Sequence, residues 1–96
     1  MEKGEGWIYC RMVDDSMQPR ILAGDTAFIL PGEPVPEGGV GLFCLDGSRQ
    51  IRQVFYTQSG LLLCPFNAKF PSQLVRGGAM ERLKVVGRVI RTVRRW

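Results

Sequence analysis

Turn-forming residues come at short intervals along this chain and limit the length of any regular element. The 96 residues include 12 glycines and 6 prolines, against roughly 12 of the two types together in a chain of average composition. Both residues interrupt helices and strands. The pattern therefore predicts frequent turns between short elements, and it favours β structure over a few long helices.

The length and overall composition indicate a single domain spanning residues 1–96. A chain of this size buries roughly 60–65% of its unfolded surface around one core, which excludes a multidomain enzyme. Hydrophobic residues make up 45% and charged residues 23%, which excludes a disordered chain or a coiled coil. The longest apolar run, 40–45, is far shorter than the roughly 20 residues that cross a bilayer. We therefore expect a soluble domain with no membrane contact.

The cysteines form no pattern typical of a disulfide framework or a metal site. There are three of them, Cys10, Cys44 and Cys64, with no Cys-x-x-Cys pair, and the chain has no histidine. Zinc sites need four closely spaced Cys, His or acidic ligands. We expect buried thiols in a reducing cytoplasm, and we expect neither a metal nor a cofactor.

Apolar residues between the turns predict six strands. Asp46-Gly47 is a strong two-residue hairpin signal, which predicts that the strands on either side of it pair. The run 40–45 is apolar on both faces, as a strand covered on both sides should be. The expected strands are 8–13, 26–30, 40–45, 49–57, 61–64 and 85–93.

The remaining segments are less regular. The stretch 85–93 fits one face of a helix, but its β-branched residues and the interior Gly87 favour a strand. We expect a helical turn at 18–22 and an irregular segment at 65–78. The fold class is therefore mainly β, as a small, strongly bent antiparallel sheet or partly open barrel.

A serine follows the first expected strand. Ser16 stands at a junction between a strand and a turn, where its hydroxyl could be presented beside free backbone N–H groups that bind an oxyanion. That is one geometry for acyl transfer. The alternative, which the local sequence alone favours, is that Ser16 caps the short turn that follows.

A longer pattern begins at the same serine. It runs Ser16-Met17-x-Pro19-x-Ile21-x-x-Gly24-Asp25. This pattern resembles the S24 peptidase-like domain of LexA, UmuD and phage repressors. The resemblance covers nearly the whole chain from Ile8. Besides the serine pattern, it extends through residues 35–45, the Asp46-Gly47 hairpin, residues 61–65 with Asn67, and residues 85–90.

The resemblance implies a fold, a context and an activity. In that family the domain is the C-terminal half of a transcriptional repressor and dimerises it. A Ser–Lys dyad in the domain cuts the segment that joins the two halves when a RecA filament is engaged. The resemblance therefore implies that this chain is the C-terminal fragment of a longer repressor, whose DNA-binding half would precede Met1.

The family's catalytic residues carry over only in part. Ser16 matches the nucleophile. Counting from Gly39 through the hairpin without a gap, the family lysine falls on Arg52. Arg52 shares a strand face with partly apolar side chains, so we expect it not to be freely solvated. Asp14 stands where glycine is commoner, which alters the backbone beside the nucleophile.

Arginine is a poor substitute for a general-base lysine. A buried lysine becomes a base when its pKa falls from about 10.4 toward 7, whereas arginine starts at 12.5 or higher, and the difference to pH 7 is at least about 7.5 kcal/mol. No histidine exists, and Lys3, Lys69 and Lys84 lie outside the motif. We therefore expect self-cleavage to be impaired.

Other possible bases and the missing cleavage site also bear on whether this chain can cleave itself. Asp14 or Asp15 could in principle accept the serine proton, but both are expected to be exposed or paired with Arg52. The family cuts an Ala-Gly or Cys-Gly bond well before the serine, and residues 1–15 contain neither. Ala23-Gly24 lies inside the motif, where a cut would destroy the fold.

The sequence thus predicts a dimerising, regulatory domain of a LexA-like or prophage-type repressor. We expect a homodimer in which the final strand contributes an exposed edge around Val85, Val89, Ile90 and Val93. DNA would be bound through the absent N-terminal domain, and a RecA filament is a further candidate partner. The alternative is an active S24-type serine peptidase that cleaves itself with Ser16 as nucleophile.

Positive charge gathers at the C-terminal end. Of the 13 basic residues, six lie in residues 81–96, beside one acidic residue. Arg88, Arg91, Arg94 and Arg95 could contact nucleic-acid phosphates, but the segment lacks the surrounding basic field and interleaved aromatic residues of a dedicated binding surface. A solvated strand face is the preferred interpretation.

Overall fold

Strands form about half of residues 6–94, the part of the chain that the computed structural model describes. The elements are β1 (Ile8–Arg11), β2 (Thr26–Pro31), β3 (Val40–Leu45), β4 (Ser48–Tyr56), β5 (Gly60–Cys64), β6 (Gln73–Arg76), a short 3-10 helix η1 (Gly77–Arg82) and β7 (Leu83–Val93). All six strands predicted from the sequence are confirmed, with end points that differ by up to two residues.

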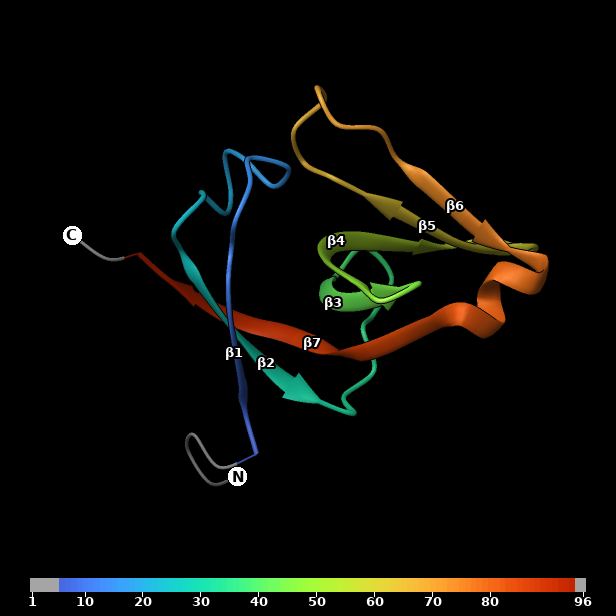
Figure 1. The fold of residues 1–96 in the computed structure, drawn as a ribbon, viewed down its shortest axis with the longest axis horizontal. Coiled ribbons are helices and arrows are strands. Elements are labelled where there is room, and N and C mark those ends of the chain that lie inside the picture. The colour runs from blue at the N-terminus through green and yellow to red at the C-terminus, as the bar shows by residue number, and fades with distance from the viewer. Residues whose placement is uncertain (1–5, 95–96) are drawn as a thin grey trace.

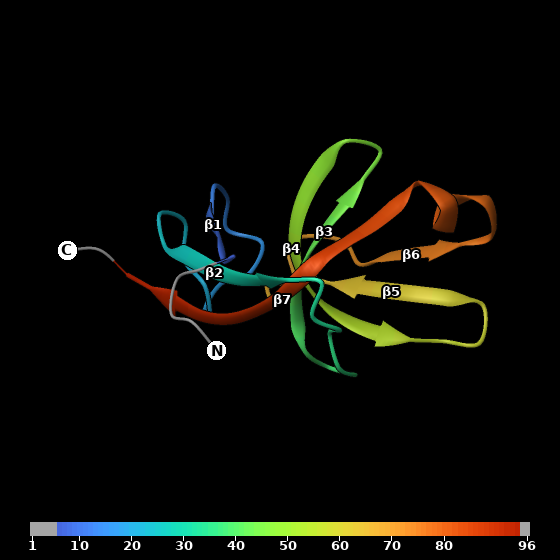
Figure 2. The same cartoon turned by 90° about the horizontal axis from the view of Figure 1, so that it is seen from below.

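The seven strands form one antiparallel sheet in the order β1-β2-β7-β3-β4-β5-β6. Figure 1 shows β7 crossing the molecule from the β1-β2 end to the β5-β6 end. Seen from below, the strands fan out strongly instead of lying in one plane (Figure 2). The predicted mainly β, strongly bent sheet is therefore confirmed.

The hairpin between β3 and β4 forms where the sequence places it. Asp46 and Gly47 both have positive φ, 52° and 82°, the conformation that a tight two-residue hairpin turn requires. The pairing runs from Leu45↔Ser48 to Val40↔Gln53. This register carries Arg52 opposite Gly41, at the end of the hairpin far from the turn.

The core lies on both faces of the bent sheet. Neighbouring residues of a strand point to opposite faces, and Leu42 belongs to one buried cluster while Phe43 belongs to the other. The expectation that 40–45 is covered on both sides is thus confirmed. The first cluster contains Met12, Met17, Ile21, Ala27, Ile29, Leu42 and Ile51. The second contains Val35, Phe43, Leu45, Val54, Leu61, Leu63 and Val75.

The final element is a strand, as expected, but it is not at an edge of the sheet. Residues 83–88 pair with β3, and residues 87–93 pair with β2. Gly87 is the point where the two neighbours meet, and a Cβ there would lie 2.3 Å from the Leu30 carbonyl oxygen. The expected exposed edge along Val85–Val93 is therefore present only in part, because residues 87–88 are paired on both sides whereas residues 89–93 pair with β2 alone.

The segment 65–78 is more ordered than predicted. Its second half forms β6, which pairs with β5 from Gly60↔Arg76 to Leu63↔Gln73. Val75 is buried in the second cluster and supplies the apolar contact that a four-residue strand needs. The expected helical turn at 18–22 is present as a hydrogen-bonded turn, in which the Ile21 N–H donates to the Met17 carbonyl at 2.9 Å.

The three cysteines are free thiols and are half-buried rather than buried. Among residues 6–94, no group of three or more His, Cys, Asp or Glu side chains is placed to hold a metal ion. No helix in the same residues is long and apolar enough to cross a membrane.

Candidate functional site

The segment between β1 and β2 folds into a loop that is fixed at its base and at its tip. At the base, the Met12 N–H donates to the Asp25 carbonyl at 2.8 Å and the Gly24 N–H donates to the Met12 carbonyl at 2.7 Å. At the tip, Met17 is fully buried in the first cluster. Ser16, its neighbour, is therefore held against the body of the sheet.

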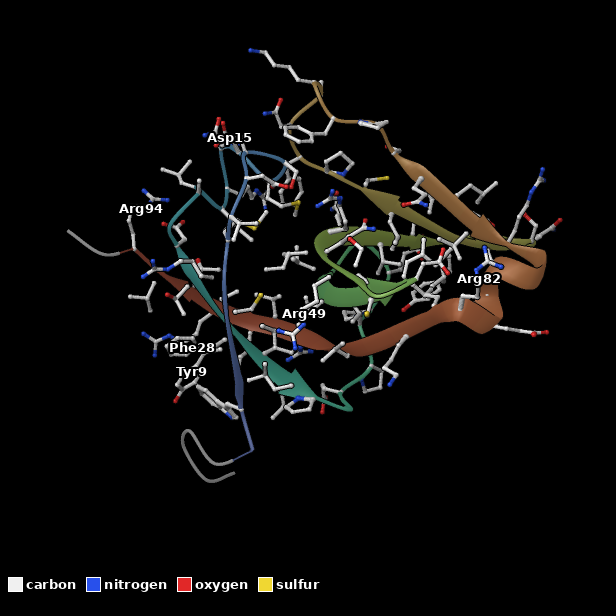
Figure 3. The ribbon with its side chains drawn as sticks, viewed as in Figure 1. Tyr9, Asp15, Phe28, Arg49, Arg82 and Arg94 are labelled. Atoms are coloured by element: carbon white, nitrogen blue, oxygen red, sulfur yellow. The ribbon has the colours of Figure 1, made fainter. Side chains whose placement is uncertain are left out.

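Asn67, in the segment between β5 and β6, forms two hydrogen bonds to the same loop. Its backbone N–H donates to the Ser16 carbonyl at 3.0 Å, and its side-chain Nδ2 donates to the Asp15 carbonyl at 2.9 Å. Asp15 and its loop lie at the upper left of the molecule in Figure 3. Asn67 thus fixes the carbonyl groups of Asp15 and Ser16, one on each side of the Ser16 Cα. The sequence marks Asn67 only as part of the family pattern and gives it no role.

The Ser16 hydroxyl lies between a carboxylate and a guanidinium. Its Oγ donates to Asp14 Oδ1 at 2.6 Å and accepts a hydrogen bond from Arg52 Nη1 at 2.9 Å. The Ser16 N–H also donates to Asp14 Oδ1, at 3.0 Å. Because the hydroxyl bonds these two side chains, it does not cap the following turn, so that alternative interpretation is wrong.

The structure therefore brings Ser16 and Arg52 together across 36 positions of the sequence. Arg52 is half-buried on β4, as expected, and its Nη1 also donates to the Ile51 carbonyl at 2.9 Å. Asp14 and Asp15 are exposed, and neither forms a direct ion pair with Arg52 among the described residues. The expected pairing of a carboxylate with Arg52 is thus indirect, through the serine hydroxyl.

The pKa values of the two charged groups respond to this arrangement. The hydrogen bond from the Ser16 hydroxyl is the main cause that lowers the pKa of Asp14. Burial opposes it as the second-largest effect, and the Ser16 N–H and the charge of Arg52 lower the pKa further. Burial lowers the pKa of Arg52, while the negative charge of Asp14 opposes that change. At pH 7 the serine therefore lies between an anion and a cation.

This arrangement holds a serine proton but offers no strong acceptor for it. An efficient general base has a pKa near the working pH, and the pKa of Asp14 is below its ordinary 3.8. A guanidinium has five N–H donors and no acceptor, so Arg52 can only donate to the serine oxygen. Lys69 and Lys84 are exposed and do not contact Ser16, and Lys3 lies outside the described residues.

A cleft of about 690 Å³ adjoins the site. Asp14 and Arg52 line its wall, together with residues of β1, of β4 and of the segment 71–73. Ser16 itself is fully buried and does not line the cleft. The two hydrogen-bond partners of the serine oxygen thus line the cleft, whereas the serine oxygen itself is buried behind its wall.

The family-model comparison agrees with the fold and with the serine motif. The model of the Peptidase S24-like family matches residues 1–90. The chain therefore belongs to the S24 peptidase-like family. No curated protein matches the sequence.

Proposed function

We propose that this chain is the dimerising, regulatory C-terminal domain of a LexA-like or prophage-type transcriptional repressor, and that its self-cleavage is impaired. The family membership supports the scaffold. A DNA-binding half elsewhere in the protein would contact the operator, and a RecA filament would be the inducing partner. The protein would work in the cytoplasm, where its three free cysteines stay reduced.

One observation carries the proposal: Arg52 Nη1 donates to Ser16 Oγ at 2.9 Å, in the position where the family has its lysine. A lysine amine at this place could lose its proton and then accept the proton of the serine. Deprotonating a guanidinium at pH 7 costs at least about 7.5 kcal/mol, and half-burial of Arg52 does not supply that. Arg52 therefore holds the serine oxygen without activating it.

Reaction of the purified chain with a fluorophosphonate tests this directly. An activated serine forms a bond from its oxygen to phosphorus, fluoride leaves, and the hydroxyl proton passes to the base. We expect intact-mass measurements to show no adduct on the unaltered chain. We expect an adduct on Arg52→Lys, formed faster as the pH rises and the new amine loses its proton.

Ser16→Ala in the Arg52→Lys background is the control, since it removes the acceptor oxygen and must abolish the adduct. Lys84→Arg is a matched change of an exposed residue away from the site and should leave the chain unlabelled. If Arg52→Lys folds normally but stays unlabelled, Arg52 is not what keeps Ser16 unreactive.

The proposed dimer uses the surface of β7 around Val85, Val89, Ile90 and Val93, with strand pairing along the C-terminal half of β7. Val85 is 45% and Val93 is 37% exposed, while Val89 and Ile90 are half-buried. Beyond Arg88, the side of β7 that faces away from β2 has no strand partner among the described residues. A second copy could pair there across a two-fold axis. Two joined domains would then present two DNA-binding halves to a palindromic operator at high effective concentration.

Sedimentation of Ile90→Glu tests the dimer. Ile90 lies at the irregularity between Phe28 and Ile29 in the β2-β7 register, so a charge there disturbs the open side with little effect on the first cluster. We expect a monomer. Leu74→Glu is the control, because it places the same charge on an apolar residue of another strand, β6, where Leu74 is exposed, and it should leave the dimer intact. A dimer that survives Ile90→Glu contradicts the assignment.

An active serine peptidase is the second candidate, and the hydrogen bond from Ser16 Oγ to Asp14 Oδ1 is the observation that favours it. In that case Asp14 takes the hydroxyl proton. The unaltered chain would then form the fluorophosphonate adduct, and Asp14→Asn and Ser16→Ala would each abolish it. Labelling of the unaltered chain that depends on Asp14 overturns the first proposal in favour of the second.

A further inference from the structure

The outer face of the β1-β2-β7 end brings together side chains that are far apart in the sequence. Ala27 and Ile29 of β2 are fully buried, so they point into the core. The residues between them and on either side of them in β2, with their partners in β1 and β7, therefore point outward. The pairings Tyr9↔Phe28 and Phe28↔Arg91 place three of them in one row. The outward residues are Trp7, Tyr9, Arg11, Thr26, Phe28, Leu30, Arg88, Arg91 and Val93. We call this set the aromatic-arginine face.

Three aromatic rings lie against one another on this face. The Tyr9 and Phe28 rings are stacked, with centroids 4.8 Å apart and planes at 28°. The Trp7 ring lies on the other side of Phe28, at 5.9 Å and 56°. Tyr9 is 60% exposed, and Figure 3 shows Tyr9 and Phe28 beside each other at the β1-β2 end. An open, supported ring of this kind is a surface on which another planar ring can stack.

One arginine contacts these rings, and two more lie on the same face of the sheet. The Arg91 guanidinium lies 5.3 Å from the centroid of Phe28, and Arg11 and Arg88 occupy outward positions of the flanking strands. No acidic residue occupies an outward position of β1, β2 or β7 in the part of the chain that the structure describes. Arg94 is not part of this group, because it is bonded to Asp25. The face is therefore both aromatic and positively charged.

We propose that the aromatic-arginine face binds single-stranded nucleic acid. A base stacks on Tyr9, and Arg11, Arg88 and Arg91 contact the phosphates on either side of it. Single strands bind to grooves and sheets of this composition because unpaired bases expose their flat faces and each phosphate carries a charge. Duplex DNA hides those faces. The sheet thus supplies the interleaved aromatic residues that the basic C-terminal segment lacks when it is considered alone.

Fluorescence anisotropy of a labelled dT oligonucleotide, titrated with the purified chain, tests the proposal. We expect binding that weakens with salt, with a slope of log K against log [salt] of about −2 for three phosphate contacts. Tyr9→Ala should weaken binding at least about fivefold, whereas Tyr9→Phe should retain it because the ring remains. Arg91→Gln should make the slope shallower by about 0.7.

Arg76→Gln is the charge-matched control, because Arg76 is exposed on β6 at the other end of the sheet. Tyr9 is a surface residue, so circular dichroism should show that its variants remain folded. Sedimentation of each variant reports whether the same face binds a second copy of the chain.

Four results would overturn the proposal. They are an absence of binding at 50 mM salt, equal affinity for single-stranded and duplex DNA, equal losses for Arg76→Gln and Arg91→Gln, and a dimer that dissociates in Tyr9→Ala. The last result would assign the face to self-association. None of these outcomes bears on the reactivity of Ser16, so nucleic-acid binding and impaired self-cleavage are tested separately.

Discussion

Under the proposed function, an arginine at the lysine position of a Ser–Lys dyad reverses the direction of hydrogen bonding at the Ser16 oxygen. In a Ser–Lys dyad the neutral amine accepts the serine proton, whereas Arg52 donates a proton to the serine oxygen. The Ser16 hydroxyl donates its hydrogen bond to Asp14 instead, and Asp14 is exposed and has a lowered pKa. The contacts are short, but neither partner is an effective base: Arg52 is already protonated, and the lowered pKa of Asp14 makes its carboxylate a weak proton acceptor.

The motif residue Asp25 has a structural role that its pKa makes testable. Its carboxylate is buried and accepts hydrogen bonds from Arg94 Nε at 3.1 Å and from the Leu22 N–H at 2.9 Å. Asp25 thus joins the loop that carries Ser16, which we call the serine loop, to the residue that follows β7. The hydrogen bond from Arg94 is the main cause that lowers the pKa of Asp25, and the Leu22 N–H adds to it.

A carboxylate with a lowered pKa stabilises the fold at pH values above its unfolded pKa of about 3.9. This contribution is lost as the pH falls through the folded value, which lies below 3.8. We therefore predict that Asp25→Asn lowers the melting temperature at pH 7. The gap to the unaltered chain should shrink as the pH falls below about 4. Thermal denaturation between pH 7 and pH 3 measures it, and a gap that stays constant would contradict the assigned role.

At the scale of the elements, local patterns predict the strands but not their neighbours. The alternation in β1 and β4 and the Asp46-Gly47 turn act over a few residues, so the sequence shows them directly. The position of β7 between β2 and β3 depends on pairings between residues 38 or more positions apart. β6 was missed because Gln73–Arg76 has one buried residue, Val75, and carries no periodic signal of its own.

The same distinction applies to the serine site and to the aromatic-arginine face. Ser16 stands in a recognisable local motif, but its contact with Arg52 was predicted only through the family resemblance, since no local rule joins residues 36 positions apart. The aromatic-arginine face could not be predicted at all, because the pairing of three strands brings Tyr9, Phe28 and Arg91 together.

Gly87 gives a prediction for the central strand. A Cβ at this residue would lie 2.3 Å from the Leu30 carbonyl oxygen, so β2 and β7 would have to separate. We expect Gly87→Ala to destabilise the protein by about 1–3 kcal/mol, or roughly 4–8 °C in melting temperature for each kcal/mol. Gly78→Ala is the matched control, because a Cβ there meets nothing within 4 Å. Equal melting temperatures for the two variants would show that the strands tolerate the methyl group.

At the scale of the whole molecule, β7 joins two hydrophobic clusters that lie on different faces of the sheet. Val86 and Val89 pack against the first cluster, and Leu83 packs against the second. β3 and β4 also contribute to both, through neighbouring residues such as Leu42 and Phe43. Because β3, β4 and β7 contribute side chains to both clusters, loss of packing in one cluster disturbs strands that also pack in the other.

We therefore predict that the domain unfolds in one cooperative transition and that damage to either cluster destabilises all of it. Met17→Ala in the first cluster and Leu63→Ala in the second each remove a fully buried side chain, which costs about 2–5 kcal/mol. Calorimetry should show a single peak for each variant, shifted to lower temperature, with equal calorimetric and van't Hoff enthalpies. Two peaks, or a shift of only part of the signal, would mean that the clusters unfold separately. Because the serine loop is anchored by Met17 and Arg52 is on β4, a single transition also means that the contact between Ser16 and Arg52 persists until the whole sheet unfolds.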